Sequence, residues 1–176
     1  MNKQILEIIN NLKGSLLGIG LNDNTFLDAI EQNNNINTCY LLNNISLTGK
    51  KFSITKRGKN KKINIKKIKK YFKKKSLDNI IVNYDTIKQF YRSFIPNSIY
   101  LNKDTLYIYG NKNDLENLKQ KYQRYTNDIK ITKDNDNFIM KINNKNTKNH
   151  FFKDTLYKIK DFSSDAANII TDLLIN

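Results

Sequence analysis

The chain has 176 residues, of which 39% are hydrophobic, and a formal net charge of +15, so we expect one folded domain with a very polar surface. One Cys and one His exclude a disulfide framework and a Cys/His zinc cluster. No apolar stretch approaches the ~20 residues that span a bilayer, and the chain does not begin with a secretory signal, so we expect a cytoplasmic protein without a membrane partner.

The N-terminal part predicts a helix, then a strand–loop–helix unit, then a second strand. Apolar residues at helical spacing predict the first helix over residues 3–12. A strand is expected over 15–20, a helix over 24–32 and another strand over 36–42. The loop between the first strand and its helix directs backbone N–H groups out of the strand's carboxyl end. Open α/β sheets hold nucleotide-like ligands at such a junction.

Residues 50–75, called the basic segment below, contain fourteen of the 31 basic residues of the chain and no acidic residue. A strand over 51–55 and a helix over 61–74 with one apolar stripe are expected here. Like charges at i,i+4 destabilise a helix and normally alternate with Glu, so this composition favours a docked basic helix that binds a polyanion. The nucleic-acid contacts predicted for the basic segment are Lys56, Arg57, Lys59, Lys61, Lys62, Lys66, Lys67, Lys69, Lys70, Lys73 and Lys74.

Two observations on the basic segment have competing interpretations. A/T-rich coding would enrich Lys, Asn and Ile without any selection for binding, but it would raise Glu as well, and Asp plus Glu number only 16. The aromatic side chains of Phe52, Tyr71 and Phe72 could stack on bases. For Tyr71 and Phe72, packing of the basic helix onto the sheet is the favoured interpretation.

The second half of the chain predicts further alternating elements. The only proline, Pro96, is expected to end a helix, and Asn113 and Asp114 are expected to cap the next one. In chain order the elements are a strand over 77–82, a helix over 85–94, a strand over 105–109, a helix from 113 to 122, an antiparallel hairpin of 129–132 with 138–142, and helices over 149–160 and 164–174.

This order predicts an α/β fold with a Rossmann-like, mostly parallel sheet that is flanked by helices and ends in an antiparallel β-hairpin and C-terminal helices. We expect a single domain over 1–176, with an N-terminal helix in 1–14, the α/β core in 15–143 and a C-terminal helical extension in 144–176. Over about 15–143 the arrangement resembles the class I S-adenosylmethionine-dependent methyltransferase fold.

The resemblance implies a cofactor site at the ends of the first two strands, with altered motif residues. In that family the first strand ends in an acid, followed by spaced glycines around the methionine part of the cofactor, and the second strand ends in an acid that binds the ribose. Alignment on Gly20 places Gly18 at the first acid, Asn22 and Asn24 at later glycines, and Asn43 at the ribose-binding acid. The resemblance thus implies a weakened or lost S-adenosylmethionine site and no metal.

A second, looser resemblance concerns Asn83, Tyr84 and Asp85 at the end of a predicted strand. They are similar to the polar–Pro–Pro–aromatic motif with which amino-methyltransferases hold a target nitrogen, although both prolines are absent. In an active enzyme Asn83 and Tyr84 would therefore be the catalytic residues. The alternative is an ordinary strand-end turn with a helix N-cap.

Three functional hypotheses remain open from the sequence. The first is a methyltransferase-like pseudoenzyme that binds nucleic acid, RNA rather than DNA, through the basic segment. The second is an active S-adenosylmethionine-dependent methyltransferase that acts on RNA or DNA. The third is a non-catalytic module in which the basic helix binds an acidic protein partner.

Overall fold

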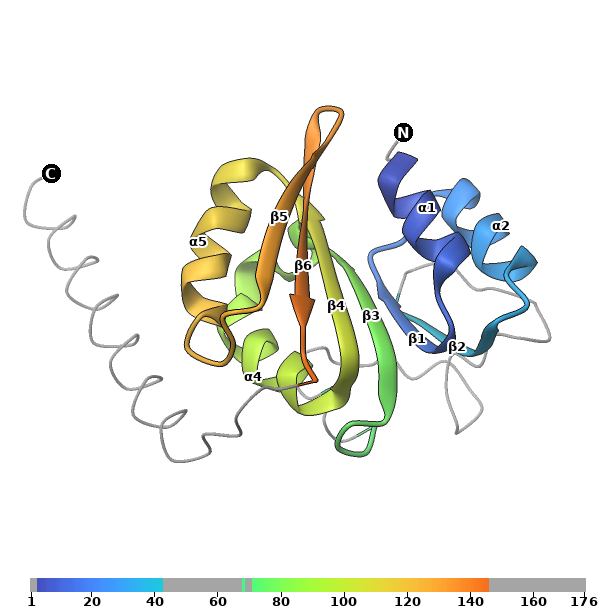
Figure 1. Cartoon of the computed structure of the whole chain (residues 1–176), viewed down its shortest axis with the longest axis horizontal. Coiled ribbons are helices and arrows are strands. Elements are labelled where there is room, and N and C mark those ends of the chain that lie inside the picture. Colours follow the sequence, from blue (N-terminus) through green and yellow to red (C-terminus); the bar gives the residue numbers. More distant parts are fainter. Residues whose placement is uncertain (1–2, 43–67, 69–70, 146–176) are drawn as a thin grey trace, which may run out of the picture.

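The computed structural model describes residues 3–42, 68 and 71–145. In this part of the chain six strands form one sheet in the order β2-β1-β3-β4-β6-β5 (Figure 1). The strands β1 to β4 are parallel, whereas β6 is antiparallel to both of its neighbours, β4 and β5. Their bounds are β1 Gly14–Ile19, β2 Ile36–Leu42, β3 Leu77–Asn83, β4 Asn102–Gly110, β5 Ile129–Asp134 and β6 Asn137–Asn143. The predicted α/β class, mostly parallel with a terminal antiparallel hairpin, is confirmed.

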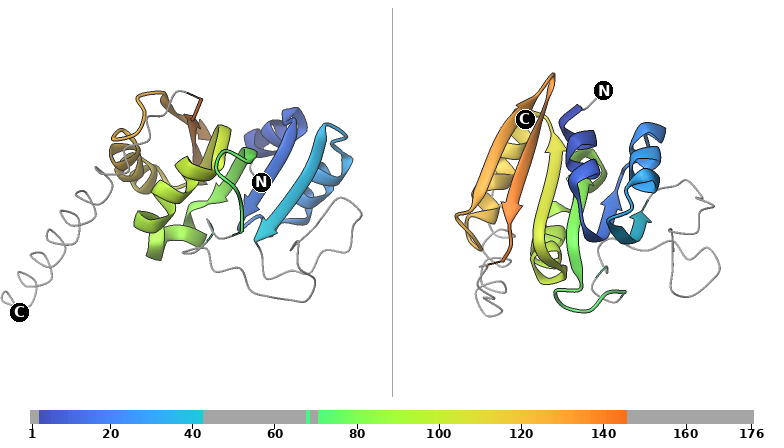
Figure 2. Two further views of the ribbon diagram at one scale, coloured as in Figure 1. Left: turned by 90° about the horizontal axis from the view of Figure 1, so that it is seen from below. Right: turned by 45° about the vertical axis from the view of Figure 1, so that its right-hand side comes forward.

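Helices cover both faces of this sheet (Figure 2). The helices α1 (Lys3–Asn11) and α2 (Asn24–Gln32) pack on one face, and α4 (Tyr91–Leu101) and α5 (Lys112–Tyr122) pack on the other. Between β3 and α4 the chain forms the short helix α3 (Tyr84–Ile87) and the 3₁₀ helix η2 (Lys88–Phe90). The helices predicted over 149–160 and 164–174 lie outside the described residues.

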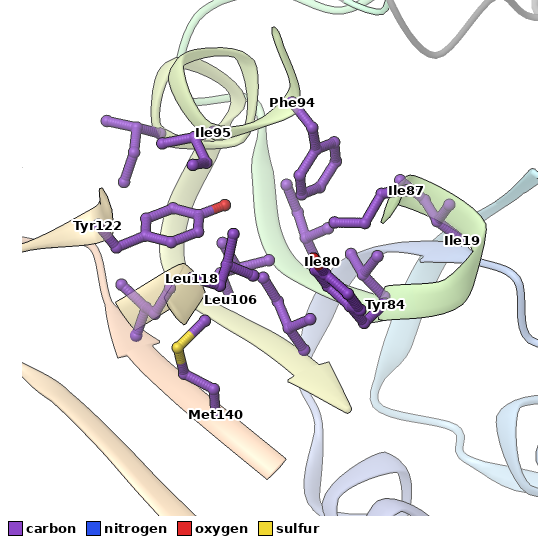
Figure 3. Packing of buried hydrophobic residues seen from close by; sticks show 14 of the residues in the cluster. Ile19, Ile80, Tyr84, Ile87, Phe94, Ile95, Leu106, Leu118, Tyr122 and Met140 are labelled. Carbon is purple, nitrogen blue, oxygen red and sulfur yellow. The ribbon is translucent and has the colours of Figure 1, made fainter. Parts of the chain in front are cut away.

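Two hydrophobic cores lie on the two faces because side chains alternate along each strand. In β1, Leu17 and Ile19 belong to the core under α4 and α5, whereas Leu16 belongs to the core under α1 and α2. Figure 3 shows the first of these cores around Tyr122, which is fully buried and whose hydroxyl lies 2.7 Å from the hydroxyl of Ser98. Burial on both faces explains why the central strands are continuous apolar runs.

The helix predicted over 85–94 continues past Pro96, so the prediction that Pro96 ends it is wrong. Pro96 lies inside α4, which extends to Leu101. An interior proline costs about 3 kcal/mol because it removes a hydrogen bond and crowds the preceding turn. Phe94, Ile99 and Leu101 are almost fully buried, and each such side chain contributes about 1.5–3 kcal/mol. Packing on the sheet therefore outweighs the proline.

The predicted cap of α5 is also wrong. The N-cap is Asn111, whose side-chain oxygen accepts a hydrogen bond from the backbone N–H of Asp114 at 2.9 Å. Asn113 and Asp114 lie inside the first turn. Asn111 directly follows β4 and keeps an extended backbone, so the helix begins earlier than the sequence pattern indicated.

The end of the basic segment is docked on the sheet. Ile68 is buried in the core under α4 and α5, and the ring of Phe72 packs edge-on against Tyr40 of β2, with ring centroids 4.9 Å apart. The backbone N–H of Lys75 donates to the carbonyl of Tyr100 at 2.9 Å. The favoured interpretation, packing on the sheet, is therefore confirmed for Phe72.

Two expectations for the same stretch are wrong. Residues 71–75 form turns, so the helix predicted over 61–74 does not include residues 71–74. Lys75 has a positive φ of 53°, which is the conformation that reverses the chain into β3. Tyr71 does not share the buried side of Phe72, and 46% of its surface is exposed. The strand predicted over 51–55 and the rest of that helix lie outside the described residues.

Candidate cofactor site at the carboxyl edge of the sheet

The structure brings most of the predicted cofactor and target residues to one edge of the sheet. Because β1 and β3 are adjacent and parallel, the residues that follow them meet at what we call the carboxyl edge. Asn43 lies outside the described residues. The remaining predicted residues follow or end these two strands, namely Gly18, Gly20, Asn22, Asn24, Asn83 and Tyr84.

Gly20 directly follows β1, and side chains from β3, α3 and β4 approach it closely. Its φ is +71°, a conformation that suits glycine. A Cβ atom at this position would lie 2.0 Å from the hydroxyl oxygen of Thr86 and 3.0 Å from the Cβ of Asn83. The carbonyl oxygen of Gly20 accepts a hydrogen bond of 3.3 Å from the hydroxyl of Tyr109. The protein's own side chains therefore occupy the space beside Gly20.

Gly18 has a packing role in the core under α1 and α2. A Cβ atom on Gly18 would lie 2.6 Å from the Cδ2 of Leu41 and 2.7 Å from the Cδ1 of Leu21. Both leucines are almost completely buried. An acidic side chain here would displace two buried side chains and place a charge in an apolar environment, which is costly without a partner.

Tyr109 belongs to β4, and its hydroxyl reaches Gly20 at the carboxyl edge. It is only 7% exposed, and its ring meets that of Phe26 edge-on, with centroids 6.2 Å apart. Burial raises the pKa of Tyr109 to about 12, with further increases from Asp23 and Asp85, while a hydrogen bond with the side chain of Asn83 opposes the rise. The hydroxyl is therefore neutral and able to donate to Gly20 at physiological pH.

The N-terminus of α2 is capped by a carboxylate of the protein itself. The carboxylate of Asp23 accepts hydrogen bonds from the backbone N–H of Thr25 at 2.9 Å and from its hydroxyl at 2.7 Å. These bonds lower the pKa of Asp23, so the carboxylate is charged at neutral pH. It occupies the place at which a helix N-terminus would otherwise attract an anionic ligand. The adjacent Asn22 and Asn24 are exposed.

Asn83 and Tyr84 have structural roles in this geometry. The side-chain oxygen of Asn83 accepts a hydrogen bond from the backbone N–H of Asp85 at 3.1 Å and is the N-cap of α3. Tyr84 is 6% exposed and packs in the core near Ile87 (Figure 3), and burial is the main reason that its pKa is raised. The strand-end turn with a helix N-cap, which was the alternative interpretation of this motif, is observed.

Two residues of this edge were not predicted from the sequence. Thr86 and Tyr109 fill the space beside Gly20, yet they were expected only to belong to a helix and a strand. One signal was available for Tyr109, because it directly precedes Gly110 at the end of a predicted strand. Since β1, β3 and β4 are parallel, the end of β4 lies at the same edge of the sheet as the loop that follows β1.

Comparisons with known proteins add a similarity of fold. No protein-family model matches the chain, and no curated protein sequence matches it. A solved structure of M. capricolum TrmK in complex with the natural cofactor product S-adenosyl-homocysteine is similar, with a TM-score of 0.49 and 15% identity, over 84% of this chain and 69% of that chain. At this identity the similarity concerns the arrangement of the elements.

The described residues at the carboxyl edge differ from the pattern that the family resemblance implies for an S-adenosylmethionine site. The acid that the family resemblance implies is replaced by Gly18, which leaves no space for a side chain, and the carbonyl of Gly20 already has a partner in Tyr109. Residues 3–42, 68 and 71–145 also contain no group of three His, Cys, Asp or Glu residues that could hold a metal ion. In the same part of the chain no helix is long and apolar enough to cross a bilayer.

Proposed function

We propose that this protein is a methyltransferase-like, non-catalytic protein that binds nucleic acid, RNA in preference to DNA, through the basic segment. The observation that carries this proposal is the separation of charge along the chain. The basic segment holds fourteen of the 31 basic residues and none of the 16 acidic residues, which leaves 17 basic and 16 acidic residues elsewhere. Almost the whole net charge of +15 therefore resides in residues 50–75.

Charge that is concentrated in this way is suited to a polyanion. Lysines that neutralise phosphates release condensed counterions, and this release drives sequence-independent nucleic-acid affinity. Coding bias would spread lysine over the whole chain, whereas the remainder of this chain is nearly balanced. The contacts of Ile68 and Phe72 with the sheet support the proposal, because they fix the end of the basic segment that is described, and fixed residues lose less conformational entropy on binding.

The geometry beside Gly20 supports the non-catalytic part of the proposal. A cofactor atom at the position of a Cβ on Gly20 would meet Thr86, and one that bonded the Gly20 carbonyl would compete with Tyr109. A cofactor bound at this edge would also approach the charged carboxylate of Asp23 at the N-terminus of α2. The active-methyltransferase hypothesis has no comparable support among the described residues.

Binding of the full chain to labelled RNA and DNA oligonucleotides at about 50 and 200 mM salt tests the nucleic-acid part. If six to ten phosphates are contacted, affinity should fall by about 10³–10⁵ between these concentrations. Absence of binding at the lower concentration would refute the proposal. If an acidic protein is instead captured from extract after nuclease treatment, the interaction-module hypothesis replaces it.

Calorimetric titration with S-adenosylmethionine tests the non-catalytic part separately. We expect no heat at millimolar ligand, which corresponds to a binding free energy weaker than about −4 kcal/mol. Saturable heat in the micromolar range would overturn this part and favour an active methyltransferase on RNA or DNA.

A further inference from the structure

The edge of the sheet opposite the candidate cofactor site carries exposed lysines on four adjacent strands. Lys13 precedes β1, Lys73 and Lys74 precede β3, Lys103 begins β4 and Lys145 follows β6. In Figure 1 the turn before β3 and the end of β6 both lie at the lower edge of the sheet. We call this the amino-edge surface. It consists of the exposed residues Lys13, Lys73, Lys74, Lys103 and Lys145, together with the exposed Tyr71, which lies in the turn before β3 that also holds Lys73 and Lys74.

Hydrogen bonds fix the backbone of the segments that carry these lysines. The side-chain amide of Asn79 donates to the carbonyl of Lys13 at 2.8 Å, and the hydroxyl of Ser76 donates to the carbonyl of Lys73 at 2.7 Å. The ammonium group of Lys75 donates to the carbonyl of Asn144 at 3.2 Å. Adjacent strands are about 4.8 Å apart, so β1, β3, β4 and β6 spread these lysines over roughly 15 Å.

The carboxylate of Asp78, near the amino-edge surface, already has hydrogen-bond and ion-pair partners within the protein. The carboxylate of Asp78 accepts hydrogen bonds from the backbone N–H and the hydroxyl of Ser15 and pairs with Lys103 at 3.3 Å. Asp104 and Asp128 also lie near these strand ends, since their backbone carbonyls accept from the N–H groups of Asn144 and Asn143. Burial and then the neighbouring charge of Lys74 lower the pKa of Lys75, while the charge of Asp104 opposes this shift.

Tyr71 gives the amino-edge surface an aromatic group. It is the one large hydrophobic residue that is exposed in the described part of the chain, at 46%. Its backbone N–H donates to the carbonyl of Ile68 at 3.0 Å, and the next residue, Phe72, is fixed against Tyr40. The ring is thus presented to solvent from a docked turn, beside Lys73 and Lys74. Exposed aromatic rings beside a basic track are the platforms on which single-stranded bases stack.

We infer that single-stranded nucleic acid lies across the amino-edge surface, with a base stacked on Tyr71 and phosphates neutralised by Lys13, Lys73, Lys74 and Lys145. The inference rests on the proposed function and extends it, because the surface is continuous with the end of the basic segment. It places the bound strand on the edge opposite the loop that contains Gly20. Asp23, Asp85 and Asp114 make that other edge less favourable to phosphates.

Fluorescence anisotropy of the full chain with labelled oligouridine and oligothymidine of about 12 nucleotides, and with a duplex of the same length, tests the inference. Tyr71→Ala should weaken single-strand binding by about 5- to 150-fold, the effect of losing one stacked base, whereas Tyr71→Phe should bind like the native protein. The double variant K73Q/K74Q should lower the slope of log K against log salt by about 1.4, since each single-strand phosphate contact contributes about 0.7.

A matched control removes the same charge from the opposite edge. Lys112 begins α5 after β4, and Lys133 lies near the end of β5, so K112Q/K133Q should leave the salt slope unchanged. If the native protein binds but Tyr71→Ala and K73Q/K74Q behave like this control, the inference fails and the proposed function stands. The inference also fails if the duplex binds more tightly than the single strands and Tyr71→Ala does not change that binding. If the native protein binds none of the three probes, the proposed function itself fails.

Discussion

Replacement of Gly20 by alanine tests whether the protein's own side chains fill the carboxyl edge. Gly20 has a φ of +71°, and its added Cβ would meet the Thr86 hydroxyl at 2.0 Å. The left-handed conformation costs alanine about 1–2 kcal/mol, and overpacking adds about 1–3 kcal/mol. We expect Gly20→Ala to lower the free energy of unfolding by about 3 kcal/mol. For a domain of this length that corresponds to roughly 6–12 °C in Tm.

Urea and thermal unfolding followed by circular dichroism measure this loss of stability. Two further variants serve as a control and as a test of the cause. Asn22→Ala changes an exposed position of the same loop and should stay within about 0.5 kcal/mol of the native protein. Thr86→Ala removes the crowding hydroxyl, so in the Gly20→Ala background it should restore about 1 kcal/mol while the backbone strain persists. A loss below about 1 kcal/mol for Gly20→Ala, without rescue by Thr86→Ala, would refute the close approach and reopen this edge to a ligand.

Three further predictions concern buried or capping groups. Tyr109→Phe removes the hydroxyl that donates to the Gly20 carbonyl and should cost about 1–2 kcal/mol in urea unfolding, because a buried acceptor loses this partner. Asp23→Ala removes the N-cap of α2 and should cost about 1 kcal/mol, with a loss of helical ellipticity if α2 frays. Burial raises the pKa of the Cys39 thiol from 9.0 to about 12, so the unfolded chain loses that proton first and stability should fall as the pH rises from 9.0 towards 12. At lower pH a thiol reagent should modify Cys39 only as the protein unfolds, and fast modification of the native protein would contradict this.

The elements that the sequence predicted well are those whose signals are local. The first helix, the strand–loop–helix unit around Gly20 and the strand over 36–42 agree with α1, β1, α2 and β2 within a residue or two. Their apolar periodicity and the capping Asp23 act over a few residues. The signal for the hairpin of β5 and β6 was equally local, since Asn135 adopts a positive φ in its turn.

The errors arise where tertiary packing overrides a local rule. Pro96 is tolerated inside α4 because residues on both sides of it are buried on the sheet. Tyr71 follows a helical pattern in the sequence, but residues 71–75 form turns that lead into the central strand β3, and Tyr71 is exposed there. Neither outcome could be read from a window of neighbouring residues.

The candidate site shows a different limit, because a glycine leaves space without specifying what enters it. The sequence located Gly18 and Gly20 at the end of the first strand, which is where they lie. Whether a ligand or a side chain uses that space depends on Thr86 and Tyr109, which arrive from elements later in the chain. A pattern of glycines in one loop is therefore equally compatible with a cofactor cradle and with close packing.

The two edges of the sheet should also respond independently to substitution. At the carboxyl edge Thr86 and Tyr109 pack against Gly20, so changes there should act through the free energy of unfolding. At the amino edge, Tyr71 and Lys73 are exposed, so changes there should act on nucleic-acid affinity with little effect on stability. Because sites more than about 7–10 Å apart without shared partners are nearly additive, combining Tyr71→Ala with Asn22→Ala should give the affinity loss of the first variant alone. Strong coupling between these two variants would mean that the bound strand reaches across the sheet to the loop that contains Gly20, and the division of roles between the edges would then be wrong.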